Sequence, residues 1–145
     1  MANHYKSIVV AVDGSKEAEY AFRKSLDVAA RNKGSVLNIV NVIDTLPFEP
    51  QERSVAERIQ RDSEELLDGY KVQAVADGIE NVQVLVEHGS PRSIITREIS
   101  KKVSADLIIC GATGIGAVQR FLIGSVSEAI VRSAECDVLV IRTPE

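Results

Sequence analysis

The chain has 145 residues, of which 45% are hydrophobic and 26% charged, and these values are typical of one folded domain. Seventeen Lys and Arg against 21 Asp and Glu give a net charge of -4, which argues against the basic surface that nucleic-acid binding usually needs. Aromatic residues make up only 4% and Trp is absent, so platforms for stacking bases are scarce and aliphatic residues are the expected core.

The N-terminal part of the chain predicts a strand followed by a helix. Residues 7–12 form a continuous β-branched run, which is typical of a strand buried on both faces. Residues 15–33 carry apolar side chains at helical spacing, with Ser15 as the expected N-cap and Gly34 as the expected stop. The chain therefore begins as an α/β unit.

The same alternation continues to the C-terminal end. Two prolines within residues 43–50 delay the second helix. Ser90 and Pro91 are expected to cap and begin the third helix, and His88 is expected just past the third strand. We predict further strands at residues 36–42, 82–86, 106–110 and 138–141, and further helices at 52–77, 90–103 and 125–134.

Five strands that alternate with four helices predict a parallel sheet, because parallel neighbours need crossover connections. The expected fold is a doubly wound three-layer α/β/α sandwich formed by one domain over residues 1–145. Ligands of such sheets bind beyond the carboxyl ends of the strands, where the strand order reverses. We therefore examine the loops after strands one, two and four.

The connection after the fourth strand carries the clearest functional signal. It runs from Gly111 to Ser125, much longer than the usual ~2–6 residues. Gly111 and Gly114 would bring bare backbone amides to the sheet edge, and Gly124 and Ser125 would add amides at a helix N-terminus, a combination suited to a polyphosphate. The alternative is an ordinary loop followed by a capping box formed by Ser125 and Glu128.

Two common nucleotide motifs are excluded. The chain has no Gly-Lys-Ser/Thr, and no G-x-G-x-x-G follows its first strand. The glycine arrangement instead resembles the universal stress protein family, whose ATP-binding members carry G-x2-G-x9-G-[S/T] between the fourth strand and the last helix. Residues 8–15 and 124–142 are also similar to the family's opening and closing segments, whereas Ala117 stands where many relatives have a third loop glycine. The motif positions are filled by Gly111, Gly114, Gly124 and Ser125.

The resemblance implies a specific site. The sheet order would be 3-2-1-4-5, as in the adenine nucleotide alpha-hydrolase-like fold, with Asp13 beside Gly111. The implied ligand is ATP with Mg or Mn, and Asp13 would meet the ribose or the metal. The adenine would contact Ala11, Val12, Val42 and Cys110, and the ribose and phosphates would contact Gly111, Thr113, Gly114, Gly124, Ser125 and Val126.

Simpler interpretations exist for several of these residues. Asp13 before Gly14 is also typical of a turn, and Cys110 is explained by packing at the end of a buried strand. Arg120 is expected to be a surface charge. The two thiols, Cys110 and Cys136, show no metal-ligand or disulfide spacing, and His88 has no partner in the sequence that suggests catalysis.

The resemblance implies a regulatory, stress-response protein whose ATP occupancy alters its homodimer or its contacts with an unidentified protein partner. A slow ATP hydrolase and a nucleotide-independent interaction module are the alternatives; efficient hydrolysis is not expected, because no Walker lysine or positioned base is evident. A phosphoacceptor receiver domain is disfavoured, because Asp13 is a lone acid after the first strand and no Asp follows the third.

The fifth strand predicts self-association. In the implied order it lies at the edge of the sheet, yet residues 138–141 are all apolar and lack the charges or proline that protect edges. We expect a homodimer through strand 137–142, paired antiparallel about a two-fold axis. No stretch approaches the ~18 apolar residues of a membrane span, so we expect a cytoplasmic protein without membrane contact.

Overall fold

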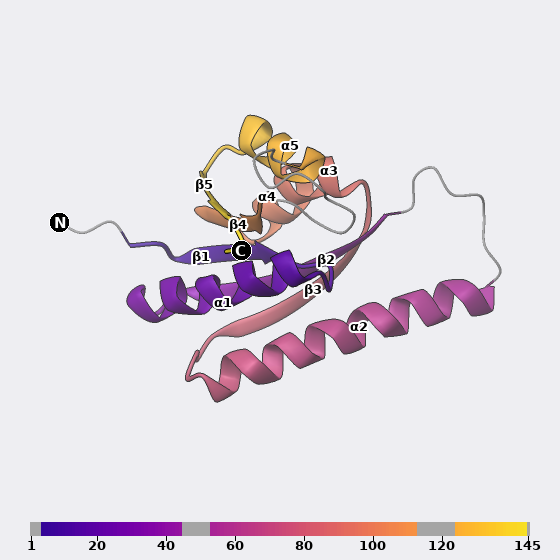
Figure 1. Ribbon diagram of the computed structural model, residues 1–145, viewed down its shortest axis with the longest axis horizontal. Helices are drawn as coiled ribbons and strands as arrows, with labels where there is room; N and C mark the ends of the chain where they lie inside the picture. Colours follow the sequence, from indigo (N-terminus) through magenta and orange to yellow (C-terminus); the bar gives the residue numbers. More distant parts are fainter. Residues whose placement is uncertain (1–3, 45–52, 113–123, 145) are drawn as a thin grey trace.

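The computed structural model describes residues 4–44, 53–112 and 124–144 (Figure 1). Its five strands form one sheet of order β3-β2-β1-β4-β5, and every neighbouring pair is parallel. This confirms the expected α/β class and strand order. The strands are β1 (Ser7–Ala11), β2 (Val36–Asp44), β3 (Val82–Gly89), β4 (Leu107–Gly111) and β5 (Asp137–Ile141).

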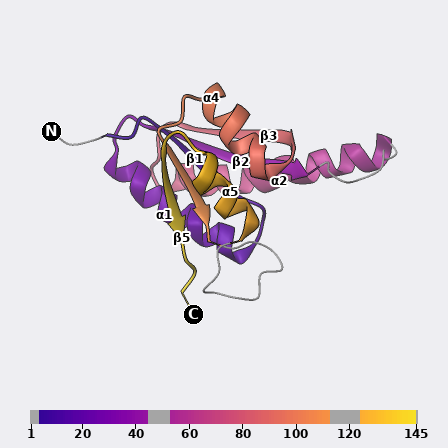
Figure 2. The ribbon, with the colours of Figure 1, turned by 90° about the horizontal axis from the view of Figure 1, so that it is seen from above.

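Helices cover both faces of the sheet and give the three expected layers (Figures 1 and 2). One face packs against α1 (Lys16–Arg31) and α2 (Arg53–Ala76). The opposite face packs against α5 (Ser125–Ser133) and a continuous helical segment. That segment consists of α3 (Pro91–Ile94), the π-helical turn η1 (Ile95–Ile99) and α4 (Ser100–Lys102).

The central strands are apolar throughout because both of their faces are buried. On β1, Ile8 and Val10 pack into the cluster beneath α1 and α2, whereas Val9 between them packs into the cluster on the other face. All three are fully buried. Phe22 of α1 and Tyr70 of α2 meet in the first cluster with ring centroids 4.7 Å apart. The alternation along the strand thus joins the three layers.

Strands β2 and β3 are longer than predicted, and they pair with each other as far as Asp44 and Gly89. His88 therefore lies within β3, where it pairs with Ile43, and the expectation that it follows the strand is wrong. The two strand ends extend together because backbone ladder bonding between neighbours continues regardless of side-chain polarity.

Two helix starts also differ from expectation. Ser90 is the N-cap of α3 but its side chain makes no capping bond; its carbonyl oxygen accepts from the amide of Ile94 at 2.8 Å. The N-cap of α5 is Gly124 rather than Ser125, so the alternative interpretation as a capping box is wrong. The carboxylate of Glu128 instead pairs with Arg132 at 3.2 Å.

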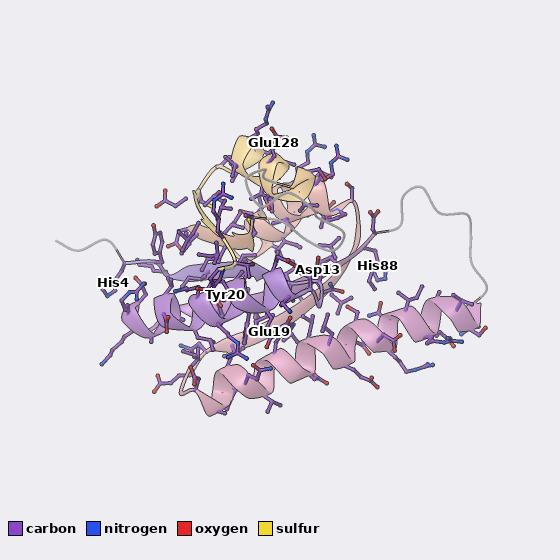
Figure 3. All side chains as sticks on the ribbon, viewed as in Figure 1. His4, Asp13, Glu19, Tyr20, His88 and Glu128 are labelled. Carbon is purple, nitrogen blue, oxygen red and sulfur yellow. The ribbon has the colours of Figure 1, made fainter. Side chains whose placement is uncertain are left out.

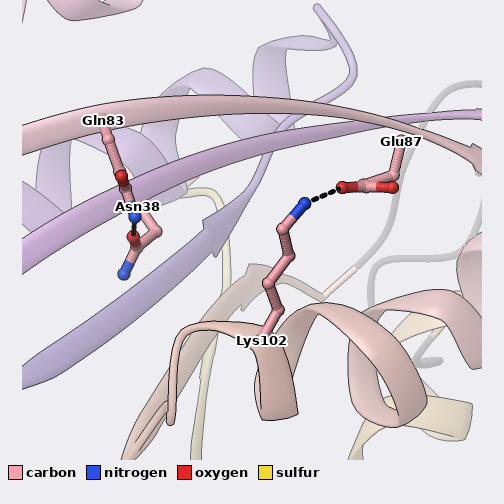
Figure 4. A network of polar contacts seen from close by, with 4 residues as sticks. All are labelled: Asn38, Gln83, Glu87 and Lys102. Atoms are coloured by element: carbon pink, nitrogen blue, oxygen red, sulfur yellow. Dashed lines mark hydrogen bonds and ion pairs between the residues drawn. The ribbon is translucent and has the colours of Figure 1, made fainter.

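The outer strand β3 carries polar side chains on the face toward α4 (Figure 4). The amide of Gln83 donates to Asn38 of β2, and Lys102 of α4 pairs with Glu87 at 3.1 Å. Asn38 is fully buried and also donates to the carbonyl of Ile8 at 3.0 Å, so its amide is satisfied within the sheet. These contacts tie the β3 edge to its neighbours.

Helix α2 extends past the sheet at its N-terminal end (Figure 1). Its buried residues begin only at Ser63 and continue through Leu67, Tyr70 and Ala74. Across the described parts of the chain, no helix is long and apolar enough to cross a membrane.

Candidate functional site

A pocket of about 430 Å³ opens at the carboxyl ends of β1, β2 and β4. Strands β1 and β4 are neighbours there, and their connections leave in opposite directions along the sheet, which is the position where open α/β sheets bind ligands. The pocket is lined by Ala11, Val12, Asp13, Ser15, Ala18, Val40, Asn41, Val42, Pro91, Ile95, Cys110, Gly111, Gly124, Ser125, Val126 and Ser127.

The structure brings most of the predicted site residues together around this pocket. Thr113 and Gly114 lie outside the described residues, as do Ala117 and Arg120. Figure 3 shows Asp13 near the same end of the sheet as His88, but His88 does not line this pocket. The predicted residues in the lining are Ala11, Val12, Asp13, Val42, Cys110, Gly111, Gly124, Ser125 and Val126.

Sequence reasoning missed other lining residues, of which Asn41 and Ser127 make informative contacts. Asn41 is one of two asparagines that interrupt the apolar run of β2, and this amide near the carboxyl end of the strand was the available signal. Ser127 lies in the first turn of α5, where no motif position marked it. The remaining unpredicted residues are Ser15, Ala18, Val40, Pro91 and Ile95.

One wall of the pocket is apolar and uncharged. Ala11, Val42 and Val126 are partly buried against the cluster that also holds Cys110 and Ile95. Burial raises the pKa of the Cys110 thiol to about 11, although a hydrogen bond with Ser127 opposes part of this effect. Cys110 is therefore a neutral thiol at physiological pH and contributes to the wall as a small apolar group.

The turn after β1 holds Asp13 at the pocket. Its Oδ1 accepts a hydrogen bond from the amide of Ser15 at 2.9 Å, and Ser15 Oγ accepts from the amide of Ala18 at 3.0 Å, which confirms Ser15 as the N-cap of α1. Gly14 between them has a φ of +84°, a conformation that favours glycine. The aspartate is exposed, and a hydrogen bond from the backbone of the turn directs its carboxylate.

The end of β4 and the start of α5 are joined at the opposite side of the pocket. The amide of Gly124 donates to the carbonyl of Ala112 at 2.7 Å, and the amide of Ala112 donates to Ile141 at 2.8 Å. The hydroxyl of Ser127 donates to the carbonyl of Gly111. These contacts aim the N-terminus of α5, with the amides of its first turn and its positive dipole end, at the pocket.

A cation in this pocket would have to be held through Asp13. It is the only acidic residue among the described lining residues. Within the described ranges, no group of three or more His, Cys, Asp or Glu is arranged to hold a metal ion. One Asp13 oxygen is engaged by Ser15, so a divalent cation here would share Asp13 with oxygens of a bound ligand, as Mg²⁺ commonly does with phosphates.

Comparison with known proteins gives one consistent family. Residues 4–142 match the model of the universal stress protein family. A protein of Staphylococcus saprophyticus that carries the name of a universal stress protein is 51% identical over 144 residues, which cover 97% of this chain and 86% of the relative.

Solved structures agree with this match. UspA, a universal stress protein from Lactobacillus plantarum, superposes with a TM-score of 0.84 at 25% identity, covering 97% of this chain and all of that one. A universal stress protein solved in complex with cAMP superposes with a TM-score of 0.75 at 24% identity, covering 98% of this chain and all of that one.

Proposed function

We propose that this chain, which belongs to the universal stress protein family, binds ATP with Mg or Mn in the pocket at the ends of β1, β2 and β4. The observation that carries the proposal is the convergence of an apolar wall, one carboxylate and a helix N-terminus on a single cavity of about 430 Å³. This size and mixture suit a purine, a sugar and a polyphosphate.

The apolar wall provides the adenine site in this proposal. Ala11, Val12 and Val42 would contact the base from β1 and β2, and the neutral thiol of Cys110 would contact it from β4. Because Cys110 carries no charge at neutral pH, it places no anion beside the ring. Main-chain groups at the ends of these strands would supply hydrogen bonds to the adenine.

The start of α5 provides the phosphate site. Gly124, Ser125 and Val126 line the pocket at the helix N-terminus, where the amides of the first turn and the helix dipole favour an anion. Gly111 lies opposite them at the end of β4. Thr113 and Gly114 complete the proposed phosphate contacts from the sequence motif. Asp13 would hold the cation together with the phosphate oxygens, or contact the ribose.

The biological role that we propose is regulation rather than efficient chemistry. No Lys, Arg or His is among the described lining residues, so this part of the chain offers no side-chain cation to stabilise charge during phosphoryl transfer. A slow hydrolase is the alternative, and a steady-state phosphate-release assay distinguishes the two. We propose that occupancy of the pocket alters contacts with a second copy or with a protein partner.

The proposed homodimer forms through strand 137–142. Strand β5 lies at the edge of the sheet. Since the carbonyl of Ile141 faces β4 through its bond to Ala112, the backbone groups of Val138 and Val140 point to the free side. Leu139 is also 38% exposed. A second β5 paired antiparallel would satisfy these groups and cover the apolar edge.

The identity of the ligand is tested by releasing it. Freshly purified protein is precipitated with acid, and the supernatant is analysed by absorbance and mass spectrometry. We expect ATP. Because a related fold was solved with cAMP, cAMP is included as a standard, and its release in place of ATP would contradict the proposed ligand.

A further inference from the structure

One asparagine side chain connects the pocket to the neighbouring helix. Asn41 lies on β2 and lines the pocket. Its Nδ2 donates to the carbonyl of Val12 at 2.8 Å, and its Oδ1 accepts from the hydroxyl of Ser63 on α2 at 2.6 Å. The segment that follows β1, the strand β2 and the helix α2 are thus joined through a single amide next to the turn that carries Asp13.

The carbonyl of Val12 determines which way this amide faces, because a carbonyl can only accept and so requires the Nδ2 donor. The Ser63 hydroxyl donates to the other end of the amide, Oδ1, and anchors it to α2. Ser63 is buried, so few water molecules compete for the bond. The amide of Val12 in turn donates to Val40 at 2.9 Å. Both backbone polar groups of Val12, the residue before Asp13, are therefore held by β2.

A second side chain of α2 supports the same turn. Leu66 lies three residues after Ser63 and so projects from the same side of the helix. A Cβ atom added at Gly14 would lie 3.7 Å from Leu66 Cδ1, so this leucine borders the side of Gly14 that a side chain would occupy. Helix α2 thus faces the turn at two places, at Val12 through the hydrogen bonds of Asn41 and at Gly14 through Leu66.

We propose that Asn41 is a positioning residue of the pocket, anchored by Ser63, and that this pair couples the placement of α2 to the placement of Asp13. The proposal rests on the proposed nucleotide function. Loss of the Asn41 bond frees the Val12 carbonyl, and loss of the Ser63 bond loosens the amide that holds this carbonyl. Either change lets the turn of residues 12–14 vary, so the unbound protein must order Asp13 before it binds ligand. The expected result is weaker binding with the fold retained.

The first test compares two asparagines on the same strand. Asn41→Ala should weaken MgATP binding about tenfold, the scale of one hydrogen bond. The matched control is Asn38→Ala, because Asn38 also lies on β2 and also donates to a backbone carbonyl, that of Ile8 on β1, but does not line the pocket. The control should lower the melting temperature while keeping the affinity within about twofold.

Asn41→Asp tests whether Asn41 must donate a hydrogen bond to the Val12 carbonyl. Aspartate has nearly the same shape but replaces the Nδ2 donor with an oxygen that faces the Val12 carbonyl. It should bind MgATP at least as weakly as Asn41→Ala. Retention of the affinity of the unmodified protein in Asn41→Asp would contradict the proposed orientation.

The second test removes the hydroxyl that anchors the Asn41 amide to α2. Ser63→Ala should weaken binding about threefold, and adding it to Asn41→Ala should weaken binding no further, because both changes break one network. Ser25→Ala is the matched control: Ser25 is buried on α1, and its hydroxyl bonds within its own helix to Phe22. This control should leave affinity unchanged.

A measurement without ligand separates this inference from the proposed function. Amide hydrogen exchange over residues 12–15 should be faster in Ser63→Ala and Asn41→Ala than in Asn38→Ala. If the unmodified protein binds no nucleotide but exchange rises as expected, the proposed function fails and the coupling stands. If it binds MgATP while the Asn41 and Ser63 variants match their controls in affinity and exchange, the coupling is wrong.

Discussion

The amide of Gly124 donates a hydrogen bond of 2.7 Å to the carbonyl oxygen of Ala112. Ala112 follows β4 and is the last residue that the structure describes before residues 113–123. Gly124 is the first residue described after them and is the N-cap of α5. Their contact brings the outer glycines of the motif, Gly111 and Gly124, to the same pocket. Gly111 and Gly124, which are far apart in the sequence, therefore lie at the same site in the structure.

Gly124→Val should abolish or greatly weaken ATP binding. The backbone of Gly124 has φ of -66° and ψ of 163°, which any residue can adopt, so the fold should persist. A branched side chain at this wall would obstruct a phosphate group, and we expect a loss of at least about tenfold in affinity.

The matched control for this variant is Gly69→Val on α2. A Cβ at Gly69 meets no atom within 4 Å, and Gly69 does not line the pocket, so the control should fold and bind as the unmodified protein does. Calorimetry gives the affinities, and circular dichroism confirms folding. Equal affinity in Gly124→Val and Gly69→Val would refute the assignment of the α5 start to phosphate binding.

Asp13→Asn should remove the dependence of ATP binding on Mg²⁺. The asparagine side-chain oxygen can still accept from the amide of Ser15, so the turn is preserved while the negative charge is lost. We expect affinity for MgATP to fall about tenfold, and affinity measured with a chelator present to change little. A variant that keeps the full Mg²⁺ effect would show that the cation is held elsewhere.

Stability should fall as the pH rises through the alkaline range. Burial raises the pKa of Cys110 from 9.0 to about 11, so the folded state disfavours the thiolate more than the unfolded state does. This contribution to stability is complete below pH 9 and is lost as the pH approaches about 11; at roughly 1.4 kcal/mol per pH unit it reaches ~2–3 kcal/mol.

The contribution of Cys110 is measured by urea unfolding at a series of pH values. Tyr5 and Tyr70 also have raised pKa values, Tyr5 mainly through its hydrogen bond to Asp137 and Tyr70 mainly through burial, so the unmodified protein loses further stability above pH 10. The specific expectation is that the stability gap between the unmodified protein and Cys110→Ala narrows above pH 9. A gap that stays constant from pH 7 to 11 would contradict it.

Changes at β5 should shift the proposed homodimer toward monomer. Val140→Pro removes an amide that points to the free side of the edge strand, and proline is tolerated at such positions. Val140→Lys places a charge in the proposed seam. Light scattering at micromolar concentration should give twice 15.7 kDa for the unmodified chain and a lower mass for both variants. A mass near 15.7 kDa for the unmodified chain would refute the homodimer.

The fold was predictable from the sequence because each central strand is a short apolar run between turn residues. The run before Asp13 and the capping role of Ser15 follow from local chemistry, and both appear where expected. The strand order came from the family resemblance, since periodicity alone does not determine which strands are neighbours. The ends of β2 and β3 were not predictable, because their last pairs depend on each other's backbone.

The pocket was predictable in part. Glycines and Asp13 are marked by their motif, and the carboxyl edge of the sheet is marked by the fold class. Asn41 and Ser127 were missed because their roles arise from contacts across elements, with Ser63 and with the carbonyl of Gly111. The π-helical turn at Ile95 was also missed; there the amide of Ser100 bonds to Ile95, one residue further than in an α-helix.

Calorimetric titration of nucleotide-free protein with MgATP tests the central claim most directly. The account predicts saturable binding of about one ATP per chain that requires the pocket at the ends of β1, β2 and β4 and is lost in Gly124→Val but kept in Gly69→Val. Absence of binding at millimolar MgATP by the folded, unmodified protein would contradict the account.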